Sequence, residues 1–148
     1  MASKVEEELR KLSVEMRILE QTAEALQARI NMVNAVITDL TYANMTLEGL
    51  EKQKENTELL IPIGGNSYIR ARLETPDKVT VGIGAGVSVE KTLQEAKEII
   101  KKRLEELEKS RASLQQQLSQ VIDRINEDRE RFEELAVTLR KETPSSNV

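Results

Sequence analysis

Two long runs of apolar residues, spaced alternately three and four apart, constrain this chain more than any other feature of its sequence. In the first, from Val5 to Leu47, twelve of thirteen such positions are apolar, and neither Gly nor Pro interrupts them. In the second, from Leu93 to Leu139, eleven of fourteen are apolar. Spacing sustained over this length is typical of a coiled coil rather than of one helix on a globular domain.

The two predicted helices are nearly equal in length, so one chain satisfies both seams by folding back into an antiparallel hairpin. In one such register Arg111 lies near Val33 and Asp128 lies near Met16. A shift by one heptad fits almost as well, so the sequence leaves the register open.

The segment between the helices is different in kind, because Gly, Pro and β-branched residues replace Glu and Lys. We predict a helix over residues 1–49, a β connector over 50–88, a second helix over 89–142 with Ser88 as its N-cap, and a disordered tail over 143–148. The fold class is therefore mostly α with a small β segment. Alternating or apolar runs and turn residues predict about two hairpins in the connector: Leu59–Ile63, Gly64-Gly65, Ser67–Leu73, Thr75–Asp77, Lys78–Ile83 and Val87–Val89.

This connector predicts partner chains. Isolated hairpins are marginal in water and their open edges invite pairing, while the apolar stripes of the two helices are expected to cover each other. We therefore expect the β segments of several subunits to form a shared sheet or barrel. A small β cap closed within one chain is the alternative. The residues expected to contribute to assembly are Tyr68, Ile69, Leu73, Val79, Val81 and Ile83.

Several chemistries are excluded by composition. The chain has no Cys and no His, which removes thiolate chemistry, disulfides, Cys/His zinc sites and imidazole bases. The glycines from Gly82 to Gly86 lack the spacing of a dinucleotide or phosphate loop and are better explained by a bulge or positive φ. Carboxylates fall at helical, solvent-facing intervals. We predict no catalytic residue, no metal and no cofactor.

Charge and hydropathy limit the compartments and the kinds of partner that are expected for this chain. No run approaches the roughly 20 apolar residues that span a bilayer, and the first residues lack the apolar stretch of a signal peptide. The net charge is −4, which disfavours nucleic acid as a partner. We expect a soluble cytoplasmic protein without membrane or nucleic-acid partners.

The ends of the two helices meet at the tip far from the connector, and apolar residues leave the seam there. Val14 and Ile18 occupy outer heptad positions on the first helix, as Val137 does on the second, close to Phe132. Exposed apolar patches often bind something, although scattered surface aliphatics are also common. A frayed tip would expose part of the seam as well. The predicted binding residues at the tip are Val5, Leu9, Leu12, Val14, Ile18, Phe132, Leu135, Val137 and Leu139.

The connector resembles that of the alpha class of prefoldin. Residues Val79–Lys91 resemble the strand-to-helix junction of that family, and Pro62-Ile63-Gly64 with Tyr68-Ile69 resembles its first hairpin. The resemblance implies a hexamer of two alpha and four beta subunits, whose joined β segments form a platform for six arms. It also implies that the arm tips hold unfolded proteins without ATP and pass them to a cylindrical, group II-type chaperonin.

Two other functions remain open. A structural scaffold or tether would dock one folded partner at the tips, and a nucleic-acid module would use its arm, although the acidic balance disfavours the latter. An enzyme is the least favoured class.

Overall fold

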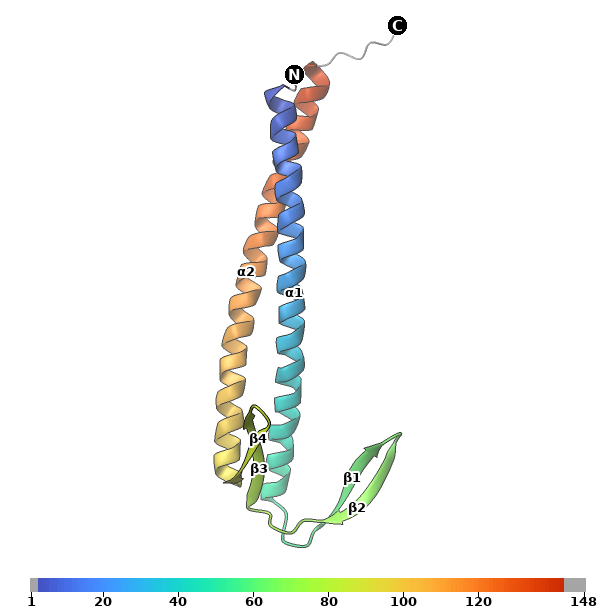
Figure 1. Ribbon diagram of the computed structural model, residues 1–148, viewed down its shortest axis with the longest axis vertical. Coiled ribbons are helices and arrows are strands. Elements are labelled where there is room, and N and C mark those ends of the chain that lie inside the picture. The colour runs from blue at the N-terminus through green and yellow to red at the C-terminus, as the bar shows by residue number, and fades with distance from the viewer. Residues whose placement is uncertain (1–2, 143–148) are drawn as a thin grey trace. The chain divides into compact units, whose positions relative to one another are not determined.

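The computed structural model describes residues 3–142 (Figure 1). Two long helices flank two antiparallel β-hairpins, as the sequence predicted. The elements are α1 (Lys4–Glu51), β1 (Glu58–Gly64), β2 (Ser67–Arg72), β3 (Lys78–Gly84), β4 (Val87–Thr92) and α2 (Leu93–Glu142). The predicted tail, 143–148, lies outside the described residues.

The helix bounds follow from local capping. At the start of α1 the Ser3 hydroxyl accepts a hydrogen bond from the Glu6 backbone N–H at 3.2 Å, which satisfies one of the free donors of the first turn. The helix runs on to Glu51, two residues beyond the predicted boundary at 49.

The predicted N-cap of the second helix was wrong. Ser88 lies within β4, opposite Gly82, and α2 begins only at Leu93. Thr92 caps it, since its hydroxyl accepts a hydrogen bond from the Glu95 N–H at 3.1 Å and lies 3.1 Å from the Glu95 carboxylate. The backbone is thus paired in β4 as far as Thr92, and the helix starts at the next residue.

Each hairpin turns through residues with positive φ. Gly64 and Gly65 have φ of 98° and 56° in the first turn, and Gly84 and Gly86 have φ of 110° and 75° in the second. Both ladders shift register beside the turn. The glycines therefore supply the bulge and left-handed backbone predicted for the second cluster.

The chain divides into two compact units, and each is described separately. The first comprises α1 up to Asn34 and α2 from Lys109 onward. Within it the two helices are antiparallel, because Glu8 pairs with Arg131 at 3.3 Å and, seven residues along α1 and seven back along α2, Glu15 pairs with Arg124 at 2.8 Å. The buried side chains of this seam are Leu12, Leu26, Ile30, Ile125, Leu135 and Asp128.

Polar partners in this unit agree with the register described above, which the sequence left open. Arg111, expected near Val33, donates a hydrogen bond to the next residue, Asn34, at 3.1 Å. The Asp128 carboxyl, expected near Met16, lies close to Glu15.

The second unit, Ala35–Glu108, holds a core that the sequence did not predict. Val81 of β3 is buried together with Leu47 of α1 and with Leu93, Ala96 and Ile100 of α2. The expectation that the helices cannot cover the β segment was therefore wrong for the second hairpin. The physical reason is Ala96, a small residue outside the seam that is fully buried (0% exposed) and leaves room for the strand.

The turn of the second hairpin is also fastened to α2. Arg103 donates a hydrogen bond from its guanidinium to the Gly82 carbonyl at 2.7 Å. Seam residue Lys97 turns its ammonium to Glu51 at 3.0 Å, and this contact lowers the pKa of the Glu51 carboxyl. The hairpin β3–β4 is thus packed on the parts of α1 and α2 that lie in the second unit, here called the helix base.

We predict that Val81→Ala lowers the free energy of unfolding by about 2 kcal/mol, because it removes buried methyl groups and leaves a cavity. Urea denaturation followed by circular dichroism measures the change. Val87→Ala, at an exposed position of the same hairpin, is the matched control and should change stability by less than about 0.5 kcal/mol. Equal effects of the two variants would contradict the assignment of Val81 to the core.

Candidate interaction surfaces

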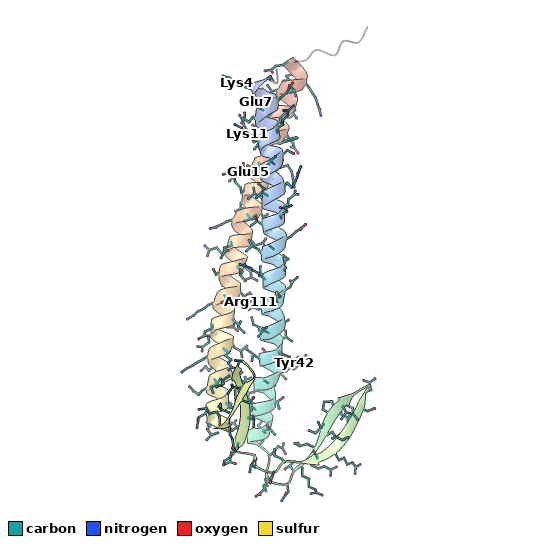
Figure 2. The ribbon with its side chains drawn as sticks, in the orientation of Figure 1. Lys4, Glu7, Lys11, Glu15, Tyr42 and Arg111 are labelled. Atoms are coloured by element: carbon teal, nitrogen blue, oxygen red, sulfur yellow. The ribbon has the colours of Figure 1, made fainter. Side chains whose placement is uncertain are left out.

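At the tip end of α1, the two predicted outer residues are exposed and share one surface. Val14 and Ile18 lie one helical turn apart. They line a shallow, largely apolar groove with four neighbours on the same helix: Arg10, Lys11, Glu15 and Leu19. Figure 2 shows Lys11 and Glu15 bordering this part of α1. The groove combines an aliphatic floor with a charged rim, which suits loose contact with apolar side chains.

Val137 does not join this groove. It is exposed, as predicted, but the hollow that it lines is formed with Glu130, Glu133 and Glu134 of α2. Its neighbour Phe132 is half-buried in the seam. The predicted cluster at the tip therefore separates into an apolar groove on α1 and an acidic hollow on α2.

The seam itself remains covered at the tip. Leu12 and Leu135 are buried, and Val5, Leu9 and Leu139 are half-buried. Because both helices are intact at these residues, the exposure expected from fraying is not seen there. On α1, the predicted tip residues that are exposed in this conformation are Val14 and Ile18.

Asp128 is the polar residue buried in this seam. It is 5% exposed, one carboxylate oxygen lies 3.5 Å from Arg124, and the other oxygen, Oδ2, has no hydrogen-bond partner. Burial raises the pKa of the Asp128 carboxyl, and the carboxylates of Glu15 and Glu127 add to the rise, while the Arg124 guanidinium opposes it. A charge held here costs stability at neutral pH.

In the second unit, the first hairpin, β1–β2, is exposed on both faces. Ile61 lies opposite Ile69, and Pro62 lies opposite Tyr68. Successive side chains point to opposite faces of a strand, so each face carries apolar groups. The exposed large side chains are Leu60, Ile61, Ile63, Tyr68 and Ile69. Eleven consecutive residues, from Leu59 to Ile69, include no charged side chain.

The predicted assembly residues fall into two groups. Tyr68 and Ile69 are on the exposed hairpin, and Leu73, just after it, is half-buried. Val79 and Val81 instead pack in the core with the helices, and Ile83 is exposed beside the second turn. Of the predicted assembly residues, Tyr68, Ile69 and Ile83 are therefore exposed, and two of these three lie on β1–β2.

Leu60, Ile61 and Ile63 also belong to the exposed apolar surface of β1–β2; they were not among the predicted assembly residues, although their sequence carried a signal. Leu59-Leu60-Ile61-Pro62-Ile63 is apolar at odd and even positions alike. A continuous apolar run of this kind is typical of a strand that is buried on both faces, whereas in the single chain Leu60, Ile61 and Ile63 are exposed.

Within residues 3–142, no three carboxylates gather as ligands for a metal ion. No helix in that range is long and apolar enough to cross a membrane.

Comparison with known families defines the class of this fold. A family model described as "Prefoldin subunit" matches residues 19–137. The chain therefore belongs to the prefoldin family, a family of chaperone subunits and not a class of enzymes.

Within that family the chain is similar to alpha subunits, which confirms the resemblance seen in the connector. It is 38% identical over 125 residues to prefoldin subunit alpha of Methanococcoides burtonii, covering 84% of this chain and 91% of the relative. It is 37% identical over 114 residues to prefoldin subunit alpha of Methanopyrus kandleri, covering 77% and 73%.

A solved structure shares the fold. The filamentous PFD of Methanocaldococcus jannaschii, determined by cryo-EM, matches with a TM-score of 0.67 and 27% identity. The match covers 76% of this chain and 93% of that chain.

We predict that Asp128→Asn raises the free energy of unfolding at pH 7 by about 1 kcal/mol, because it removes a buried charge. The folded-state pKa of Asp128 lies above its ordinary value, so protonation favours the folded form as pH falls. The advantage of the variant should therefore shrink on acidification. Urea denaturation at several pH values measures it.

Asp123→Asn, at an exposed position of α2, is the control and should leave stability almost unchanged. A less stable Asp128→Asn protein at pH 7 would show that the ion pair with Arg124 outweighs the cost of burial.

Proposed function

We propose that the chain is a subunit of an ATP-independent holdase, in which β1–β2 joins several subunits and the arm tips hold unfolded proteins. The observation that carries the proposal is the hairpin β1–β2, whose two apolar faces are uncovered in the single chain. A two-stranded hairpin of this kind gains little stability in water by itself. Association with further β segments covers its faces and its edges together.

The proposed assembly contains two copies of this chain and four beta-class subunits. The assignment to the alpha class is supported by the relatives named alpha subunits, and association between subunits is supported by the filamentous assembly of the Methanocaldococcus jannaschii protein. In the proposed assembly the β segments form a common platform or barrel, and the arms extend from that platform. We place it in the cytoplasm.

The proposed clients are unfolded proteins, which expose hydrophobic side chains without a defined sequence. The groove at Val14 and Ile18 is shallow and aliphatic, so a single contact is weak and tolerant of sequence. Several arms on one platform bind one client at several points, and avidity then supplies the affinity. Release requires no nucleotide in this scheme, and the client passes to a group II-type chaperonin.

Replacement of Val14 and Ile18 together by Ser should weaken client capture roughly tenfold, because it removes the aliphatic floor of the groove. The readout is light scattering when a denatured model protein is diluted into buffer without ATP, over a series of complex concentrations. Ile122→Ser removes an exposed aliphatic residue of α2 in the same unit and should have little effect.

Two outcomes oppose the proposal in different ways. An unmodified complex that assembles but fails to suppress aggregation would favour the tether. Loss of assembly in the Val14 and Ile18 variant would show that these residues pack inside the complex.

The double change Ile61→Asp with Ile69→Asp should abolish assembly, since it places two charges at a cross-strand pair that a partner must bury. Size-exclusion chromatography with light scattering should then give the mass of one chain, 16.7 kDa. Ser88→Asp alters an exposed position of the second hairpin and should leave the oligomer intact. An unchanged oligomer in the double variant would contradict the role of β1–β2.

A further inference from the structure

One section of the helix pair in the first unit carries no acidic residue, and it is here called the basic band. On α1 the band is Ala25–Asn34, where Arg29 is the single charged residue. On α2 the band is Lys109–Ile122, where the charged residues are Lys109 and Arg111. The whole chain, by contrast, has more acidic than basic side chains, 26 against 22. The band is therefore a positively charged section of an acidic protein.

A groove brings the two halves of the basic band together. Arg111 of α2, labelled in Figure 2, donates a hydrogen bond to the side-chain oxygen of Asn34 on α1 at 3.1 Å. The groove crosses both helices beside this contact, and no carboxylate is among the residues that line it. These residues are Arg29, Met32 and Val33 of α1 and Lys109, Ser110, Ser113 and Leu114 of α2.

The groove combines apolar side chains with one cation from each helix. Met32 is 69% exposed, and Val33 and Leu114 are half-buried, so apolar surface remains accessible. Arg29 and Lys109 are both exposed. Long basic side chains lay their methylene groups along apolar surface while the charge stays in water. The groove is therefore suited to apolar and anionic groups that arrive together.

Neither cation is neutralised by this chain. In the part of the chain that the structure describes, Arg29 and Lys109 form no ion pair. No acidic residue lies one turn before or after Arg29 on α1. On α2, Glu105 and Glu106 lie one turn before Lys109, outside the basic band, and none lies one turn after it. Both charges are thus available to an anionic partner.

The length of the basic band favours a short partner. The α1 half, Ala25–Asn34, spans about 15 Å, a distance that about five residues of extended peptide also span. Beyond the band both helices carry acidic residues, Glu24 on α1 and Asp123 on α2. A nucleic acid would extend over these carboxylates, and no aromatic side chain lines the groove for stacking on bases. A short acidic segment of polypeptide meets neither obstacle.

We propose that this groove binds short segments of unfolded proteins in which acidic residues alternate with apolar ones. The inference rests on the proposed function and adds a second client contact, of defined chemistry, away from the tip. Carboxylates of the segment pair with Arg29 and Lys109, and its apolar side chains lie against Met32 and Leu114. The tip groove differs, because the carboxylate of Glu15 is among its lining groups.

Such a contact is weak by itself. Exposed ion pairs contribute little each and are screened by salt, so binding in this groove should weaken as the salt concentration rises. In the proposed assembly the contact adds to those at the tips through avidity. A client with acidic and apolar stretches is then held at two places along the same arm.

A labelled peptide in which Asp alternates with Leu tests the groove, titrated with the full single chain and followed by fluorescence anisotropy. The double variant Arg29→Gln with Lys109→Gln should bind it roughly fivefold more weakly, because two ion pairs are lost. Met32→Ser should weaken binding as well, with both charges kept. The control Arg17→Gln with Arg129→Gln removes the same charge from exposed positions outside the basic band and should change the affinity less than about twofold.

Equal weakening in the two double variants would show that net charge alone matters and would overturn the groove. Unchanged affinity in Arg29→Gln with Lys109→Gln would overturn it too, as would tighter binding of a single-stranded oligothymidylate than of the peptide. Because the single chain is titrated, these results do not depend on assembly. Peptide binding as expected, with a complex that fails to suppress aggregation, would support the groove and contradict the proposed function.

Discussion

The packing of β3–β4 against the helix base around Ala96 is the interaction on which the arrangement of this chain depends. It joins a strand to both helices through Val81, Leu47 and Ile100, and Arg103 fastens the hairpin near its turn. This contact buries Leu47, Leu93, Ala96 and Ile100 of the two helices. The other hairpin, β1–β2, is left with two apolar faces and no cover. One hairpin thus stabilises the subunit, and the other is left for the proposed role of joining subunits.

The features that the sequence predicted correctly are those set by local periodicity. The two seams, the two hairpins and the glycine turns depend on spacing and backbone freedom, which can be read from neighbouring residues. Features decided by tertiary contacts were not predictable in this way. Ser88 has the chemistry of an N-cap, but pairing with Gly82 draws it into a strand. Ala96 lies outside the seam, and only the folded hairpin shows why it is buried.

The candidate surfaces show the same limit. Val14 and Ile18 were predicted from their heptad positions and share a groove, whereas Val137 lies among glutamates of α2. Whether residues outside the seam form one surface depends on the direction in which each points from its helix axis. The apolar pattern alone does not fix that direction. On the hairpin, Leu59–Ile63 was predicted as part of a hairpin, but Ile63 was not among the predicted assembly residues, although the run is apolar throughout.

Hydrogen exchange of backbone amides tests most directly whether β1–β2 lacks cover until subunits assemble. Exchange would be followed in the dilute single chain and in the assembled complex. We predict that in the single chain the amides of β3–β4 exchange slowly and those of β1–β2 exchange rapidly, because only the former hairpin packs on the helices. Assembly should then slow exchange in β1–β2. Equal protection of both hairpins in the single chain, unchanged by assembly, would contradict the account.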